Sequence, residues 1–307
     1  MPAGDVAFLP RASLLSFEEI TRVVEILAAE GVHDVRLTGG EPLVRRDISR
    51  LIAMIAAVPG VGDLAMTTNG ILLPKVAPAL REAGLKRLNI SLDTLDENVF
   101  KQITRRDGVD RVLAGIDAAI AAGFEQIRLN ALAIRGLTEN EIESLVRFAA
   151  ARHLTMRFIE YMPLDADRAW RDVDVLSGEE VLRLIQTRFG AIRPVLPPTA
   201  SQPARDYELL DLPKSKAGFY PTVGVIRPVT APFCGDCDRL RLTAEGTIRN
   251  CLFSTAEWDL RKLLREGGTN AQILGCIRDA VQHKRAGHLI NSPGFSQPER
   301  PMFSIGG

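Results

Sequence analysis

The stretch Val32-His-Asp-Val-Arg-Leu-Thr-Gly-Gly-Glu-Pro42 joins a short β-rich run to a turn of two glycines, a glutamate and a proline. A helix is predicted directly before it, because Ser16 and Glu19 have capping-box spacing and apolar residues recur at helical intervals as far as Gly31. A helix followed by a strand is the unit that the first half of the chain repeats.

Four further helix–strand units follow this one. Helices are predicted at 47–57, 72–84, 109–122 and 139–152, and each precedes a strand, at 64–67, 86–92, 126–133 and 155–161. Thr138 with Glu141, and Ser177 with Glu180, are predicted to cap the last of these helices and the one after it. Strands that alternate with helices of this length predict parallel βαβ units in an α/β layer or barrel. A βα barrel begins with a strand, whereas this chain begins with a loop and a helix, so the first strand is predicted to be missing.

Polar side chains gather at the carboxyl ends of the predicted strands, where a βα barrel carries its chemistry. With a period of two they share faces in sets: Arg36 and Thr38; Asn89, Ser91 and Asp93; Arg128 and Asn130; Glu160 and Met162; and Thr67, Thr68 and Asn69 end one more strand. Any one of them is more easily explained as a strand-end turn or cap. Agreement at five strand ends predicts a wide, wet cavity that holds a polar ligand.

The composition changes near residue 190, where prolines mark an irregular linker, and we divide the chain into domains 1–190 and 191–307. The second part is predicted to contain short antiparallel strands at 207–210 and 224–228, a hairpin at 239–243 and 247–250, and helices at 257–265 and 270–283. The chain ends in Gly306-Gly307, which by itself would be read as a frayed end.

Three of the four cysteines, Cys234, Cys237 and Cys251, have the spacing C-x2-C-x13-C in and around the predicted hairpin. One tight turn can aim the first pair at a single metal, and the third can return from the hairpin. Three thiolates with an open position are typical of a chemically active centre, because structural zinc usually has four protein ligands. A closed zinc site remains an alternative, with a fourth ligand from Cys276, His283 or His288.

The composition excludes several classes of protein. The 307 residues suffice for two domains or for one barrel with an appendage. Lys plus Arg and Asp plus Glu both total 38, so no bulk charge favours nucleic acid or a membrane surface. No apolar run approaches a membrane span, and the N-terminus lacks the features of a signal peptide. Clustered cysteines argue for a reducing cytoplasm rather than a disulfide framework.

Together these motifs resemble the radical S-adenosylmethionine GTP 3′,8-cyclases of molybdenum cofactor biosynthesis, the molybdenum cofactor biosynthesis protein A family. The resemblance covers nearly the whole chain. It rests on Phe8-Leu-Pro-Arg11, Arg36-Leu-Thr-Gly-Gly-Glu-Pro42, Thr67-Thr-Asn-Gly70, Asn89-Ile-Ser-Leu-Asp93, Arg157-Phe-Ile-Glu160, Pro232-Phe-Cys-Gly-Asp-Cys-Asp-Arg-Leu-Arg-Leu-Thr243, Cys251-Leu-Phe253 and Arg300-Pro-Met with the terminal Ile-Gly-Gly307. Gly-Gly-Glu-Pro is shared by many radical enzymes, whereas the cysteine stretch with the Gly-Gly end is specific.

The resemblance implies an incomplete TIM-like (β/α)6 radical S-adenosylmethionine barrel without its first strand, followed by a C-terminal α+β extension that carries a second cluster. It also implies cyclisation of GTP to (8S)-3′,8-cyclo-7,8-dihydroguanosine 5′-triphosphate, the first step of molybdenum cofactor biosynthesis. S-adenosylmethionine would be the radical source, and hydrogen would be taken from C3′ of the GTP ribose. The alternative function is a non-catalytic remnant that binds GTP and a cluster or zinc.

Site residues carry over from the family by position. The resemblance implies a [4Fe–4S] cluster on Cys234, Cys237 and Cys251, and favours it over zinc. It implies S-adenosylmethionine contacts at Gly40, Ser91 and Met162, and GTP contacts at Arg36, Thr67, Arg128, Arg239, Leu240 and Arg241. It further implies that Gly306 and Gly307 enter the active site as catalytic residues. Cys276, in an apolar helical run, is expected to be a small buried hydrophobe.

The sequence departs from the family pattern in three places. Arg128 replaces the family's usual lysine, and Asp238 stands where the family commonly has asparagine. The C-x3-C-x2-C loop of the family's first cluster is absent, and Met1-Pro2 begins just past it. We therefore expect a start site placed at an internal methionine, and hence one cluster in this chain where the family has two. A degenerate relative is the alternative, and in-frame translation upstream of Met1 distinguishes the two.

The resemblance also implies partners. These are GTP, an electron donor, and cyclic pyranopterin monophosphate synthase as the next enzyme, and a homodimer is compatible with it. Neither nucleic acid nor a membrane is expected, and the expected location is the cytoplasm.

Overall fold

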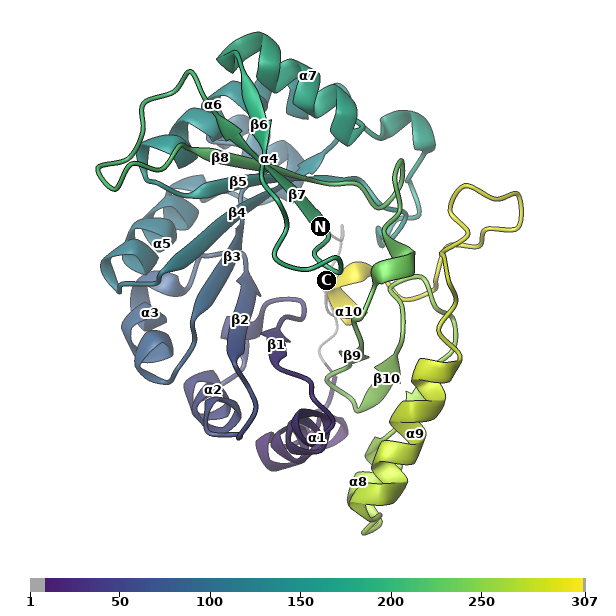
Figure 1. Ribbon diagram of the computed structural model, residues 1–307. Coiled ribbons are helices and arrows are strands. Elements are labelled where there is room, and N and C mark those ends of the chain that lie inside the picture. The colour runs from purple at the N-terminus through teal and green to yellow at the C-terminus, as the bar shows by residue number, and fades with distance from the viewer. Residues whose placement is uncertain (1–8, 306–307) are drawn as a thin grey trace.

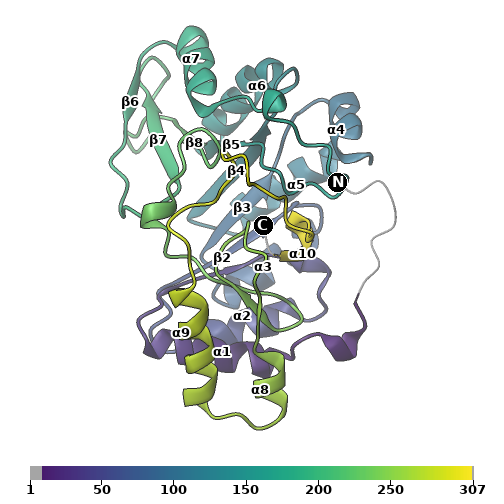
Figure 2. The same ribbon diagram turned by 90° about the vertical axis from the view of Figure 1, so that its right-hand side faces the viewer.

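A curved eight-stranded sheet organises the computed structural model, which describes residues 9–305 (Figure 1, Figure 2). Its strand order is β1-β2-β3-β4-β5-β8-β7-β6. The strands are β1 (Asp34–Leu37), β2 (Asp63–Thr68), β3 (Arg87–Ser91), β4 (Gln126–Ala133), β5 (Thr155–Glu160), β6 (Ile192–Pro194), β7 (Ala204–Leu209) and β8 (Thr222–Ile226). Neighbours among β1–β5 pair in parallel, as the helix–strand repeat predicts.

Helices cover the outer face of this sheet (Figure 1). They are α1 (Phe17–Ala29), α2 (Ile48–Ala56), α3 (Leu73–Glu82), α4 (Glu97–Thr104), α5 (Val109–Ala121), α6 (Thr138–Ala151) and α7 (Gly178–Phe189). Their apolar sides pack on alternate strand residues such as Leu64, Met66 and Leu88 to form the main core. Because strand side chains alternate between faces, the remaining residues of each strand point away from the helices, toward the concave face.

The capping predictions give mixed results. Capping boxes at Ser16 and Ser177 are confirmed. The predicted cap at Thr138 is wrong: its hydroxyl donates to the Leu132 carbonyl and accepts from the Ile134 amide, so it fastens the turn after β4. Glu141 accepts a hydrogen bond from Thr94 instead. The short helix α4 was not predicted from the sequence.

The sheet continues past residue 190. β8 pairs with β5 in parallel and with β7 antiparallel, and β6 pairs antiparallel with β7. The predicted antiparallel strands near 207–210 and 224–228 are therefore confirmed, and they extend the barrel sheet rather than form a separate layer. The division of the chain at residue 190 stays a prediction.

A smaller C-terminal unit carries the predicted hairpin. Strands β9 (Arg241–Leu242), β10 (Thr247–Arg249) and β11 (Trp258–Asp259) form a three-stranded sheet beside α8 (Arg261–Arg265) and α9 (Asn270–Gln282). The helix predicted from 257 begins only at Arg261, because Trp258 and Asp259 pair with β10. Helix α1 joins the two units, since Val24 packs into the main core while Val23 and Ile26 pack into the smaller one.

The prediction of an incomplete α/β barrel with a C-terminal α+β extension is confirmed. Within residues 9–305, β1 pairs with β2 alone and follows α1, so the described sheet remains open at this edge. The concave face of the sheet looks toward the C-terminal unit, and the last helix, α10 (Met302–Ile305), lies between them (Figure 1).

Candidate active site

Polar side chains form rows across the concave face of the sheet. The register places Thr67, Asn89 and Arg128 side by side on β2, β3 and β4. Ser91 and Asn130 are paired in the next row, one step closer to the strand ends. The shared face that the period of two predicts for these residues is thus continuous over neighbouring strands.

Two arginines of this face, Arg36 and Arg128, lie among other cations, although Arg36 is exposed and Arg128 only half-buried. Partial desolvation, and then the charges of Arg87, Arg239 and Arg157, lower the pKa of Arg36. Burial, and then Arg157 and Arg87, lower the pKa of Arg128 to about 10. Both remain cationic at neutral pH. Within residues 9–305 no carboxylate forms an ion pair with either side chain, although the charges of Asp34 and Asp206 act on Arg36 and Arg128 respectively, so the positive charge of the concave face is only partly offset by the protein.

The C-terminal unit adds two more arginines to the same region. The charge of Arg239 acts on Arg36, which shows that the two units contribute to one cationic site. Burial, and then Arg239, lower the pKa of Arg241 to about 10. Arg239 lies over the Phe233 ring at 4.9 Å, and its Nε is buried without a partner among the described residues. The Leu240 side chain instead packs against the smaller core.

Two buried amide atoms on the concave face also lack partners in the described part of the chain. They are Nδ2 of Asn89, a residue only 5% exposed, and Oδ1 of Asn130. A buried donor or acceptor that stays unpaired costs about 1–3 kcal/mol. These atoms, together with the uncompensated arginines, fit a site built for a polar anionic ligand.

Two of the cysteines, Cys237 and Cys251, lie near Arg241. Cys234–Asp236 form a 3₁₀ turn in which the Cys237 amide donates to the Cys234 carbonyl, as the C-x2-C spacing predicts. Cys237 and Cys251 both act electrostatically on Arg241. Across residues 9–305, no three side chains of His, Cys, Asp or Glu already converge as metal ligands. The arrangement therefore supplies thiols of the right type near one another, without a preformed ligand cage.

Cations favour the thiolate of Cys237. Burial by itself would raise the pKa of this thiol, but the Arg239 amide and guanidinium and the Lys284 ammonium outweigh burial and lower it. Arg239 Nη2 and Lys284 Nζ each lie 3.4 Å from the sulfur. Because the thiolate is the metal-binding form, this donor set fits an iron–sulfur cluster. Burial raises the pKa of the Cys276 thiol, which packs on the smaller core, as expected for a cysteine outside the site.

The Gly39-Gly40-Glu41-Pro42 turn follows β1. Glu41 accepts hydrogen bonds from the Leu43 amide, from the Thr68 hydroxyl and from the Asn69 amide, and so ties this turn to the end of β2. Burial raises the pKa of this carboxyl against those bonds. The polar residues Thr68 and Asn69 therefore serve the turn, as a strand-end cap would.

The C-terminal tail lies beside Gly40, and Met162 lies in a small apolar cluster. Met162 packs with Val229 and Ile290 just after β5. The Met302 amide donates to the Leu164 carbonyl at 2.9 Å. The Phe303 carbonyl lies 3.7 Å from the position that a Cβ of Gly40 would occupy. Gly306 and Gly307 lie outside the described residues, but the segment before them runs along the candidate site.

The sequence did not reveal the ion pair between Arg157 and Asp206 on the concave face, and it suggested a ligand-binding role for Glu160 that the structure does not support. Arg157 on β5 lies next to Asn130, and Asp206 on β7 binds it through two hydrogen bonds of 2.6 and 3.1 Å. The sequence signal that could have identified Arg157 is its place directly before the buried Phe158, because neighbouring residues of a strand point to opposite faces. Glu160 accepts bonds from the Gly178, Val229 and Thr230 amides and from the Thr230 hydroxyl, so it is an internal anchor.

Two family models match successive parts of the chain. Residues 4–149 match the model of the radical SAM superfamily, and residues 154–290 match that of Molybdenum Cofactor Synthesis C. A GTP 3′,8-cyclase of Rhodopirellula baltica is 54% identical over 100% of this chain and 84% of its own length. The chain belongs to the GTP 3′,8-cyclase family.

Other members of the GTP 3′,8-cyclase family agree. A protein of that name from Corynebacterium glutamicum is 41% identical over 100% of this chain and 82% of its own, and one from Mycolicibacterium smegmatis is 44% identical over 100% and 84%. Streptococcus suis SuiB bound to S-adenosylmethionine aligns with 56% of this chain and 40% of its own at 20% identity and a TM-score of 0.48, which is too distant to bear on the site. Membership of the GTP 3′,8-cyclase family makes this a radical enzyme and implies an iron–sulfur cluster and S-adenosylmethionine as cofactors.

Of the helices in residues 9–305, none has the length and apolar character to span a membrane.

Proposed function

We propose that this protein converts GTP to (8S)-3′,8-cyclo-7,8-dihydroguanosine 5′-triphosphate with S-adenosylmethionine, in the first step of molybdenum cofactor biosynthesis. The observation that carries the proposal is a group of four arginines, Arg36, Arg128, Arg239 and Arg241, none of which forms an ion pair with a carboxylate within the described residues, together with the thiols of Cys237 and Cys251 near Arg241. A triphosphate supplies the negative charge that these arginines lack. Full-length similarity to proteins named GTP 3′,8-cyclase supports the same substrate.

The arginines bind and orient the triphosphate. Arg36 and Arg128 approach it from the barrel, and Arg239 and Arg241 from the hairpin. Each guanidinium can give bidentate, charge-assisted bonds to phosphate oxygens. Thr67, next to Asn89 and Arg128 in the register, adds a hydroxyl, and the backbone of Leu240 lies between the two hairpin arginines. Fixing the substrate in this way contributes to catalysis by positioning.

Cys234, Cys237 and Cys251 would hold a [4Fe–4S] cluster. With three protein ligands such a cluster offers an open iron position, which here would bind the guanine end of GTP. Arg239 and Lys284, which contact the Cys237 sulfur, stabilise the thiolate form of this ligand. Cys276 packs on the smaller core and has no part in the cluster in this proposal.

Gly40, Ser91 and Met162 would contact S-adenosylmethionine, which supplies radical chemistry when bound. Ser91 is exposed at the end of β3, Gly40 lies beside the tail, and Met162 packs in an apolar cluster just after β5. Gly306 and Gly307 would complete the catalytic site, because glycines can follow the docked α10 into a narrow space without a side-chain clash.

The remaining proposals concern partners. GTP is the substrate, an electron donor feeds the reaction, cyclic pyranopterin monophosphate synthase takes the product, and the location is the cytoplasm.

Anaerobic reconstitution with iron and sulfide tests the proposal. We expect about four irons per chain, the complement of one [4Fe–4S] cluster, together with saturable GTP binding in equilibrium dialysis. Cys251→Ala should lose the iron, whereas the matched control Cys276→Ala should keep it. Zinc in place of iron, about eight irons per chain, or no GTP binding by the reconstituted chain would contradict the proposal.

A further inference from the structure

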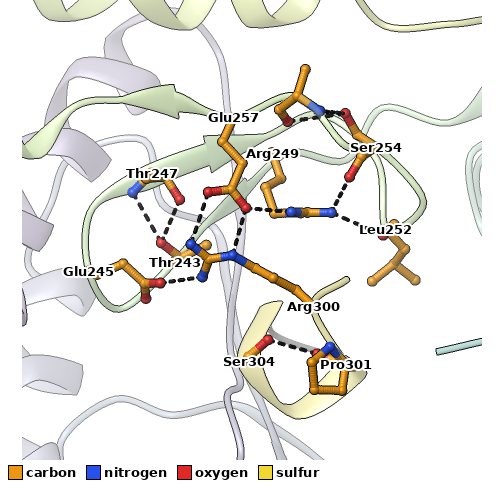
Figure 3. A network of polar contacts seen from close by, with 11 residues as sticks. Thr243, Glu245, Thr247, Arg249, Leu252, Ser254, Glu257, Arg300, Pro301 and Ser304 are labelled. Atoms are coloured by element: carbon orange, nitrogen blue, oxygen red, sulfur yellow. Dashed lines mark hydrogen bonds and ion pairs between the residues drawn. The ribbon is translucent and has the colours of Figure 1, made fainter. Parts of the chain in front are cut away.

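A network of charged side chains joins the C-terminal tail to the cysteine hairpin (Figure 3). Arg300 lies just before α10 and forms ion pairs with two glutamates. Its Nη2 and Nε lie 3.0 and 2.8 Å from the oxygens of Glu257, and its Nη1 binds Glu245. The tail is therefore held to both ends of the β9–β11 sheet by one guanidinium.

The second arm of this network reaches the loop after Cys251. Glu257 also binds Arg249, which is only 2% exposed. Arg249 Nη2 in turn donates to the carbonyls of Leu252, at 3.4 Å, and Ser254 (Figure 3). Arg249 thus fixes the three residues that follow a proposed cluster ligand.

Glu257 is the group that both arms share. Arg249 uses Glu257 alone as its carboxylate partner within residues 9–305, whereas Arg300 uses Glu257 and Glu245. Two arginines and two glutamates balance in charge, so the loss of any one of them leaves a partly buried charge without its partner.

Beyond Arg300 the tail runs directly to the candidate site. The Met302 amide binds the Leu164 carbonyl, Ile305 is 1% exposed, and the Phe303 carbonyl adjoins Gly40. Two anchors, one ionic and one apolar, therefore fix the position of α10 beside Gly40.

We propose that Glu257 is a positioning residue that couples the placement of the C-terminal tail to the conformation of the Cys251 loop. The proposal rests on the proposed function, in which the loop carries a cluster ligand and the tail completes the catalytic site. When the tail is displaced, Glu257 keeps Arg249 as a partner but loses the bonds from Arg300 that orient its carboxylate, so Arg249 and the loop carbonyls are held less firmly. A disordered loop in turn weakens the hold of Glu257 on Arg300. The tail would consequently dock firmly only when the cluster loop is in place.

Hydrogen–deuterium exchange of the full-length chain, prepared without cluster or GTP, tests the coupling by mass spectrometry. The variant Arg300→Gln leaves Arg249 paired with Glu257, so the buried core of the network stays neutralised and the chain should fold. In the tail, we expect amide exchange to quicken about tenfold, because the variant loses a charge-assisted bond that stabilises the docked state. At residues 251–255, which Arg300 does not touch, we expect amide exchange to quicken several-fold. Alkylation of the Cys251 thiol by iodoacetamide should quicken in parallel.

Three further variants separate coupling from a general loss of stability. Glu257→Gln should quicken exchange in both segments, Glu257→Asp should restore part of the protection, and Glu245→Gln should act mainly on the tail. Glu266→Gln, an exposed glutamate on the same unit, is the matched control and should change neither segment. Exchange in β3 should stay at the parent level in every variant.

The coupling is overturned if Arg300→Gln changes the tail alone while Glu257→Gln changes the loop alone. The coupling is also overturned if amide exchange in β3 quickens together with exchange in both segments, because that result would show a general loss of stability. Because these measurements need neither GTP nor iron, they fail or succeed independently of the dialysis experiment that tests the proposed function.

Discussion

Arg241 and Arg249 lie directly opposite each other on the β9–β10 hairpin, yet their surroundings differ. Arg249 is almost fully buried and has Glu257 and two loop carbonyls as partners. Arg241 has no carboxylate partner in the described part of the chain, and burial and nearby cations lower its pKa to about 10. One hairpin therefore carries one arginine that is neutralised by the protein and one that is not.

The difference shows that arginine stabilises the fold at one position of the hairpin, Arg249, and is available to bind a ligand at the other, Arg241. A buried arginine that is paired with a carboxylate holds two segments of the chain together, so its removal lowers the free energy of unfolding. A buried cation without a partner lowers stability, and it is retained where a ligand supplies the opposite charge. On the barrel face, Arg157 is buried and neutralised by Asp206, whereas Arg36 is exposed and forms no ion pair with a carboxylate within residues 9–305.

The largest effect is expected from Arg249→Ala. This change leaves Glu257 without its buried partner and frees the loop after Cys251, so the free energy of unfolding should fall by about 3–5 kcal/mol. Urea denaturation of the cluster-free chain measures it. The matched control Arg193→Ala removes an exposed pair with Glu208 and should cost about 0–1 kcal/mol. Equal losses in the two variants would show that burial of the pair is irrelevant.

Arg241→Ala should affect binding instead of folding. Loss of its charge-assisted phosphate bonds should weaken GTP about 10- to 100-fold in equilibrium dialysis. The free energy of unfolding should stay equal or rise, because an unpaired buried cation is removed. Arg239→Ala should act in the same direction, and Lys262→Ala, an exposed cation of the same unit, should leave the affinity unchanged. A destabilised Arg241→Ala chain with normal GTP affinity would reverse the assignment of the two hairpin arginines.

A smaller effect is expected from Arg128→Lys, which introduces the residue that the family usually has. Lysine keeps the charge but loses the planar fork, and with it the bond to Gln126 of 2.9 Å. We expect GTP affinity to fall by about threefold to tenfold, that is by roughly 1 kcal/mol. Tighter binding in this variant would mean that Arg128 is held away from the phosphates.

The smallest effect is expected from Asp238→Asn. Asp238 is exposed, and no hydrogen bond or ion pair of its carboxylate is found within residues 9–305. A solvent-screened charge of this kind should change GTP affinity by less than about threefold, and the change should shrink as salt is raised. A larger, salt-independent gain would place this carboxylate against the triphosphate.

The sequence by itself determined the repeating architecture and the faces of its strands. Capping boxes at Ser16 and Ser177, the period of two on β2 to β5 and the C-x2-C turn all act within a few residues. Such local patterns survive folding because they depend on backbone geometry that neighbouring residues share. For the same reason the sequence alone predicts that Arg36, Thr67 and Arg128 share one face of the sheet.

Only the tertiary structure decided which of the arginines are neutralised. The partners of Arg157 and Arg300 lie 49 and 55 residues away in the sequence, at Asp206 and Glu245. The chain contains equal numbers of positive and negative side chains, so its composition favours no particular pairing. Which cation is left for a ligand depends on strand register and on packing between the two units, because electrostatic attraction acts through distance in space and not along the chain.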